Sequence, residues 1–148
     1  MDRKPQTADR KLPTLWAKWG ELLKSEGNRR ATSFRNAFSG LRRLVKTERH
    51  FQIHLFAAAC AVILAALLGF SRIEWAILVV TITLVLVAEG VNSAIERAID
   101  TTTPGFHPVA KAAKDISAGA VLIAAIASII IALLLYVPKL WALLTAWH

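Results

Sequence analysis

The chain has 148 residues, of which 55% are hydrophobic, and its mean hydropathy is +0.49. This composition is unusual for a water-soluble domain and indicates a protein whose solvent is a lipid bilayer. The one cysteine, Cys60, excludes an intramolecular disulfide and therefore gives no sign of an oxidising compartment.

The formal charge of +8 is concentrated at the beginning of the chain. Residues 1–50 contain 13 Lys and Arg with five acids, whereas residues 51–148 contain five of each. A basic arm beside a membrane favours anionic lipid heads, by about 1 kcal/mol for each basic residue near the surface. Nucleic acid is the weaker alternative, and we expect no such partner. We interpret residues 1–32 as a basic cytoplasmic extension and residues 33–148 as one membrane-embedded domain.

Two stretches before the first apolar run have helical periodicity. The stronger one gives a helix with an apolar face and basic flanks, which is typical of an amphipathic helix in the membrane interface. Its apolar residues are Phe34, Ala37, Phe38, Leu41, Leu44 and Val45. A weaker pattern at Leu15, Trp16, Trp19, Leu22 and Leu23 predicts a further surface helix. Residues 25–28, Ser-Glu-Gly-Asn, are expected to separate the two helices.

Three apolar runs follow, at about residues 51–70, 75–96 and 116–137. Each has about the 20 residues that a helix needs to cross roughly 30 Å of hydrocarbon, so we expect an all-α protein with three transmembrane helices. Basic residues lie before the first run and in the expected 97–115 connection, which places both on the cytoplasmic side. The residues expected to anchor the helices at the outer interface are Trp75, Tyr136, Trp141 and Trp147.

A row of polar side chains continues the second run beyond its apolar part. Because successive residues of a helix are about 100° apart, the row forms one stripe. It consists of Glu89, Asn92, Ser93, Glu96 and Asp100. If Trp75 marks the outer interface, Glu89 lies about 21 Å further along the helix, near the inner edge of the hydrocarbon. A carboxylate at that depth is costly, so the stripe is a candidate functional site, although Glu89 alone would equally suit a helix-end acid that reaches water.

Carboxylates and an amide at the inner interface suit Mg²⁺, which prefers oxygen ligands and usually shares them with substrate phosphates. Phosphoryl transfer needs a metal and a lysine to stabilise charge and a carboxylate near the attacking hydroxyl, which a lipid alcohol would present at this depth. Lys114 and Asp115, at the entrance of the third run, could contact a phosphate. Taken alone, the dipeptide is better explained by interfacial anchoring and helix capping. No P-loop, H-R-D or G-x-G-x-x-G motif occurs, which excludes the soluble kinase folds.

Four segments carry motifs that can be compared with known families. They are Phe34–Leu41, Thr47–His54, Glu89–Glu96 with Asp100, and Lys114–Val121. Through them the chain closely resembles the bacterial diacylglycerol kinase and undecaprenol kinase family over roughly residues 33–137. The resemblance implies a homotrimer in the bacterial inner membrane, with an amphipathic surface helix and three transmembrane helices in each protomer. It also implies composite active sites between neighbouring protomers at the cytoplasmic interface.

The same resemblance implies a role for each candidate residue. MgATP would be the phosphoryl donor, and the acceptor would be a membrane lipid alcohol. Glu89 corresponds to the general base, Asn92 to its neighbour in the motif, Glu48 and Glu96 to the metal ligands, and Lys114 with Asp115 to the pair on the phosphate side. These roles rest on the resemblance and not on composition or spacing.

The lipid alcohol is expected to be undecaprenol, converted to undecaprenyl phosphate. The segments Thr47–His54 and Thr103–Asp115 look more like the undecaprenol kinase branch than the diacylglycerol-specific branch. Conversion of diacylglycerol to phosphatidic acid is the alternative. An alternative of another class is a non-catalytic membrane subunit or an ion pathway, but a pathway would place paired ionisable groups near the bilayer midplane and not at one interface.

Overall fold

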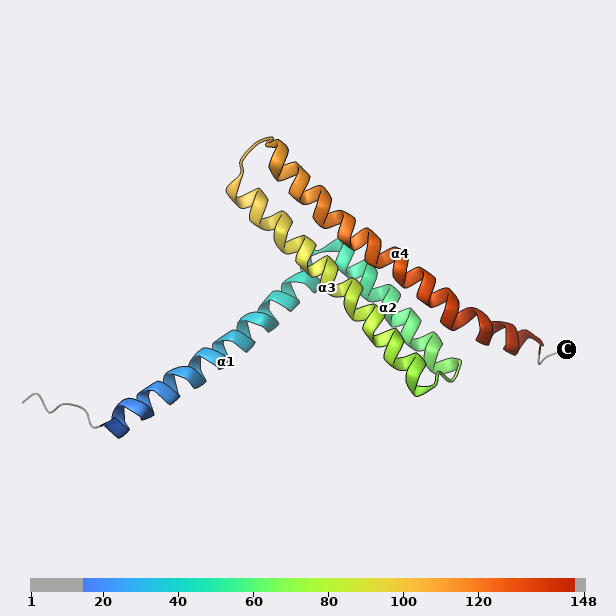
Figure 1. Ribbon diagram of the computed structural model, residues 1–148, viewed down its shortest axis with the longest axis horizontal. Helices are drawn as coiled ribbons and strands as arrows, with labels where there is room; N and C mark the ends of the chain where they lie inside the picture. The colour runs from blue at the N-terminus through green and yellow to red at the C-terminus, as the bar shows by residue number, and fades with distance from the viewer. Residues whose placement is uncertain (1–14, 146–148) are drawn as a thin grey trace, which may run out of the picture. The chain divides into compact units, whose positions relative to one another are not determined.

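The computed structural model describes residues 15–145, which form four α-helices and no strand (Figure 1). Helix α1 spans Leu15–Thr47, α2 spans Arg49–Leu67, α3 spans Arg72–Thr102 and α4 spans Pro108–Thr145. By length and composition, α2, α3 and α4 are each able to cross a membrane. The prediction of an all-α protein with three spans is therefore confirmed. Residues 1–14 and the expected anchor Trp147 lie outside the described residues.

The chain divides into two compact units, residues 1–41 and residues 42–148. In the first unit, α1 exposes Phe34 and Phe38 strongly, with 71% and 73% of their surfaces accessible. These side chains belong to the predicted apolar face, which is available for contact with a membrane interface.

The predicted separation of two surface helices at residues 25–28 is wrong, because α1 continues through this stretch. The glycine in it costs about 1 kcal/mol relative to alanine, and the serine and asparagine cost less. Such a penalty is too small to end a long helix whose flanking residues favour the helical state. Of the weaker apolar pattern, only the Trp19 side chain is described, and it is exposed.

In the second unit, α3 packs against both α2 and α4. Figure 1 shows α3 and α4 running side by side and continuing past the beginning of α2. Only 11%, 22% and 17% of the most apolar windows of α2, α3 and α4 are buried. An apolar surface of this extent is incompatible with water, so the exposed faces of the three helices are surfaces for lipid or for other chains.

The turn between α2 and α3, at residues 68–71, forms what we call the hairpin end of the helix bundle. Gly69 has φ +64, a conformation that glycine adopts without strain. Ser71 then caps α3: its backbone N–H donates to the Glu74 carboxylate at 2.6 Å and its hydroxyl accepts from the Glu74 N–H at 3.4 Å. Because of this capping box, α3 begins at Arg72, slightly before the second apolar run that was predicted from about residue 75.

Aromatic and charged residues bring α4 to the hairpin end. The Tyr136 hydroxyl donates to the Ala61 carbonyl of α2 at 2.7 Å, and its ring lies 4.9 Å from that of Phe70. Lys139 forms an ion pair with Glu74 at 3.1 Å and lies 5.4 Å from the Phe70 ring. Three helices are thus joined around Phe70 at one end of the unit.

The connection between α3 and α4 is shorter than predicted. Only residues 103–107 are non-helical, with Gly105 at φ +95, whereas the expected connection was 97–115. The polar residues on either side stay helical because ion pairs and hydrogen bonds between and within the helices satisfy them. Asp115 therefore lies in the second turn of α4, and the alternative that it caps this helix is wrong. We call this end of the bundle the site end.

Candidate active site

The predicted polar stripe lies on the buried face of α3. Leu78, Thr81, Val85, Glu89, Asn92 and Ser93 are the buried residues of this helix. Glu89 keeps only 4% of its surface accessible, and no described residue forms a hydrogen bond or an ion pair with its carboxylate. Further along, Glu96 is half-buried and Asp100 is exposed. Glu89 is therefore a buried acid whose oxygens are available to a bound molecule.

Asn92 joins the stripe to α4. The Ser117 hydroxyl donates to Asn92 Oδ1 at 2.6 Å, and Asn92 Nδ2 donates to Glu96 Oε1 at 3.2 Å. The Lys114 carbonyl lies 2.9 Å from the same hydroxyl and is a second acceptor for its one proton. Asn92 and Ser117 are both buried, so these bonds fix the orientation of the Glu96 carboxylate.

The two residues of the predicted phosphate-side pair point to different partners. The Lys114 ammonium lies 2.9 Å from Asp100 Oδ1, and it also interacts electrostatically with Glu96. Asp115 instead pairs with Lys111, one turn earlier on α4. Neighbouring positions of a helix are about 100° apart, so the dipeptide does not act as one unit. Of these two residues, only Lys114 faces the acidic stripe.

Glu48 occupies the junction between α1 and α2. It is the only non-helical residue between them, with φ −95 and ψ 107. Its carboxylate accepts hydrogen bonds from Arg97 of α3 and from the Thr47 hydroxyl. The hydrogen bond from the Arg97 guanidinium, followed by that from Thr47, holds the pKa of the Glu48 carboxyl below its ordinary value. The junction is also close to α3 at Gly90, where an added Cβ would lie 3.5 Å from Leu44.

A buried acid and a buried amide thus lie on one face of α3, and a lysine of α4 faces the exposed end of the same stripe. Over residues 35–136 the sequence matches the family described as prokaryotic diacylglycerol kinase. The chain belongs to the prokaryotic diacylglycerol kinase family. It is accordingly a multi-pass membrane protein of the lipid kinase class, and the interpretations as a non-catalytic subunit or an ion pathway are set aside.

Relatives named for two different lipid alcohols are similar to this family member. An undecaprenol kinase of Bacillus subtilis strain 168 is 46% identical over 118 residues, which cover 79% of this chain and 95% of the relative. A diacylglycerol kinase of Synechocystis sp. is 41% identical over 113 residues, covering 76% and 65%. A diacylglycerol kinase of Escherichia coli K12 is 33% identical over 106 residues, covering 72% and 84%.

Two carboxylates of this lipid kinase, those of Glu48 and Glu96, are the candidates for binding Mg²⁺. Within residues 15–145, no three His, Cys, Asp or Glu side chains form a cluster that would hold a metal by itself. Mg²⁺ commonly needs only one or two carboxylates, since waters and substrate phosphates complete its shell. Glu48 and Glu96 each accept hydrogen bonds at Oε1, and no described residue bonds either Oε2. Each of the two carboxylates is thus oriented by a neighbour and keeps one oxygen that could contribute to such a shell.

Two residues at this site of the lipid kinase were not among the sequence-based candidates. Ser117 lies in the Lys114–Val121 motif, and its hydroxyl could have been noted one turn after Lys114. Arg97 follows Glu96 directly, and the sequence indicates it only as one of the basic residues expected on the cytoplasmic side. Its partner Glu48 is 49 positions away in the chain, so only the packing of α3 against the α1–α2 junction reveals the pair.

We expect Arg97→Gln to destabilise the lipid kinase at pH 7 and to have less effect at acidic pH. Because the pKa of Glu48 is lower in the folded chain than its ordinary value of 4.5, the pair stabilises the fold above that pH, and this contribution is lost as the pH falls through the lower value. The loss should be about 0.2–1 kcal/mol, as for other solvent-accessible ion pairs. Thermal unfolding in detergent at pH 7 and pH 3.5 measures it, with Arg97→Lys as the charge-conserving control. Equal destabilisation at both pH values would contradict the role of the ion pair.

Proposed function

We propose that the chain transfers the γ-phosphoryl group of ATP to the hydroxyl of undecaprenol, giving undecaprenyl phosphate. The observation that supports this most is Glu89, a buried carboxylate without a partner among the described residues, one turn before Asn92 on the buried face of α3. The 46% identity to an undecaprenol kinase favours this alcohol. Phosphorylation of diacylglycerol is the second candidate, favoured by the relatives that carry that name.

In the proposed reaction the lipid hydroxyl gives its proton to Glu89 while its oxygen bonds to the γ-phosphorus. The bond from the γ-phosphorus to the oxygen bridging it to the β-phosphate breaks, and ADP leaves. Lys114 carries three donors, so its contact with Asp100 leaves others for phosphate oxygens. Asn92 holds Glu96 in place, and Asp115 holds Lys111 near the same end.

Mg²⁺ bound with ATP would neutralise charge that develops on the phosphates. We propose that Glu48 and Glu96 hold it, since both carboxylates are oriented by neighbours and keep one open oxygen. The remaining contribution of the chain is to exclude water and to place the lipid hydroxyl beside Glu89. The packing of α2 and α4 against α3 provides this environment.

We propose that the N-terminus and the site face the cytoplasm of a bacterium, with the chain in the inner membrane. The basic residues before α2 and between residues 97 and 114 support this orientation, because positive charge near span ends favours the cytoplasmic side. Arg97, Lys111 and Lys114 all lie at the site end. ATP is supplied on that side of the membrane.

We further propose a homotrimer with active sites shared between chains. Lys114 is held at Asp100 of its own chain, eleven residues and therefore about 16 Å along α3 from Glu89. The poorly buried faces of α2, α3 and α4 provide surface for neighbouring chains. A productive site would then combine Glu89 of one chain with Lys114 of another.

Mixing two inactive variants tests this arrangement. Chains with Glu89→Gln and chains with Lys114→Met, each inactive alone, are expected to regain part of the activity when they are refolded together, because some interfaces then contain both intact residues. Kinase activity and the size of the assembly in mild detergent are measured for each mixture. Mixtures as inactive as their parents, or a fully active monomer, would place the site within one chain.

Incubation of the purified protein with ATP, Mg²⁺ and either undecaprenol or diacylglycerol tests the function itself. The expected result is a phosphorylated lipid, with undecaprenol giving the higher kcat/KM. Phosphorylation of neither alcohol would overturn the proposed function, and preference for diacylglycerol would replace the substrate while leaving the reaction unchanged.

A further inference from the structure

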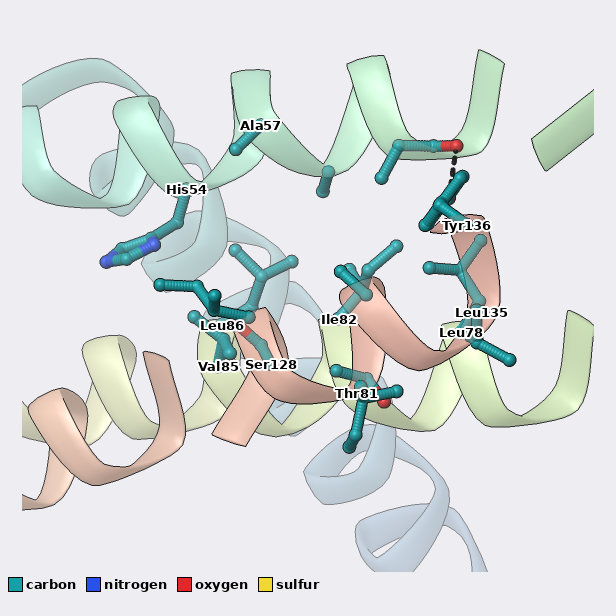
Figure 2. A pocket seen from close by; sticks show the side chains of 15 residues that line it. His54, Ala57, Leu78, Thr81, Ile82, Val85, Leu86, Ser128, Leu135 and Tyr136 are labelled. Carbon is teal, nitrogen blue, oxygen red and sulfur yellow. Dashed lines mark hydrogen bonds between the residues drawn. The ribbon is translucent and has the colours of Figure 1, made fainter. Parts of the chain in front are cut away.

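A cavity of about 200 Å³ lies between α2, α3 and α4 (Figure 2). Its walls are mainly apolar, with Ala58 from α2, Leu78, Val85 and Leu86 from α3, and Leu135 from α4 among the lining residues. Alanines on α2 and α4 leave the space open, because larger side chains at these positions would fill it. The cavity is therefore a hydrocarbon-lined space within the membrane-spanning part of the unit.

The polar groups in the wall offer almost nothing to a ligand. The hydroxyls of Thr81, Ser128 and Tyr136 donate to the carbonyls of Ile77, Ala125 and Ala61 at 2.7, 2.8 and 2.7 Å. His54 is the one lining side chain with polar atoms that has no partner among the described residues. A ligand that carries polar groups would lose its hydrogen bonds to water without replacement along these walls, so the cavity suits a hydrocarbon chain.

The two ends of the cavity differ in polarity. At the hairpin end, Tyr136 packs against Phe70, and Leu78 keeps only 4% of its surface accessible, so that end is closed by apolar groups. His54 lies at the opposite end, as Figure 2 shows. On α3, Val85 of the wall precedes Glu89 by four residues on the same buried face, about 6 Å along the helix. The wall of the cavity thus ends about one turn of α3 before Glu89.

We infer that this cavity binds the part of the lipid alcohol next to its hydroxyl, as a single hydrocarbon chain that points away from Glu89. The inference rests on the proposed function, because it takes the bound molecule to be the lipid substrate. An engineered cavity of about 150 Å³ holds one benzene molecule, so about 200 Å³ accommodates a short segment of one chain and not two chains side by side. The site therefore selects an alcohol with one chain, such as a polyprenol, over diacylglycerol, in which two chains leave the same glycerol.

Ala58→Phe tests the inference by filling the cavity one turn from His54. The KM for a polyprenol in mixed micelles is expected to rise about 10-fold or more, since steric exclusion from an apolar pocket has effects of this size. The KM for ATP should stay at the wild-type value. Ala59→Phe is the matched control, because Ala59 is the next residue on α2, is exposed and does not line the cavity. An Ala58→Phe variant with the wild-type KM for polyprenol would overturn the inference.

Photolabelling of the wild-type protein provides a readout that depends neither on activity nor on the folding of a variant. A polyprenol with a diazirine in its hydroxyl-proximal isoprene unit is irradiated with the wild-type protein in the absence of nucleotide. We expect label on lining residues such as Leu86, and strongly reduced label there in Ala58→Phe. Label confined to exposed residues such as Ile63, or label on a neighbouring protein chain in place of the cavity residues, would overturn the inference. Lipid phosphorylation that survives either result shows that only the cavity assignment has failed, whereas wild-type protein that phosphorylates no alcohol refutes the proposed function.

Discussion

Glu89→Gln is expected to lower the turnover of the lipid alcohol by about 10²–10⁴-fold, the usual cost of losing a general base. Glutamine keeps the size and the polarity of the side chain, but it cannot accept the hydroxyl proton. Glu89 is buried without a partner among the described residues, so the substitution breaks no hydrogen bond or ion pair of the fold. The kcat at saturating ATP and lipid measures the effect, and equilibrium nucleotide binding should stay unchanged.

Glu26→Gln is a suitable control for this experiment, because Glu26 is an exposed glutamate of α1 and the same atoms are exchanged. Its turnover should equal that of the wild type. Wild-type turnover in Glu89→Gln would refute the role as base. Weaker ATP binding with normal turnover at saturating nucleotide would instead assign Glu89 to nucleotide or metal binding, and Asp100 and Asp115 would become the candidates for the base.

The helices and the position of the polar stripe were predictable because they depend on local patterns. Apolar runs of about 20 residues must be helical in lipid, and the 3.6-residue period then places Glu89 and Asn92 on one face. The errors concern helix ends. Residues 25–28 and the wide connection at 97–115 looked like breaks because polar residues and glycine favour turns, yet a helix continues through such residues when the penalty is about 1 kcal/mol and neighbouring turns are intact.

The pairing of charges at the site was not predictable, because it depends on contacts between helices that are far apart in the sequence. Arg97 and Glu48 come from α3 and the α1–α2 junction, and Ser117 reaches Asn92 from α4. Lys114 and Asp115 are adjacent in the sequence but have partners on different helices. Their adjacency in the sequence therefore suggested a shared role, but neighbouring side chains of a helix point in directions about 100° apart.

Glu96→Gln is expected to raise the Mg²⁺ concentration needed for half-maximal activity by at least about 10–100-fold, since even residues that only orient metal ligands have effects of this size. Glu96 is held by Asn92 at Oε1 and leaves Oε2 without a partner among the described residues. An amide at this position has no negative charge with which to bind the ion. Glu48→Gln should have a smaller effect, because Arg97 already compensates part of the Glu48 charge.

Two measurements separate metal binding from turnover. The first is the activity as a function of the Mg²⁺ concentration, and the second is the binding of Mn²⁺ followed by electron paramagnetic resonance. Glu74→Gln is the control, because this substitution removes the same charge from the same helix, α3. Glu74 lies at the hairpin end, where it pairs with Lys139, and it takes no part in the site. The control should lose some stability and keep its Mg²⁺ requirement. If Glu96→Gln also keeps the wild-type requirement, the proposed metal role is wrong. If the Glu96→Gln variant fails to insert or to assemble, Glu96 is a structural residue and not a metal ligand. Its hydrogen bond to Asn92 would then stabilise the contact between Asn92 of α3 and Ser117 of α4.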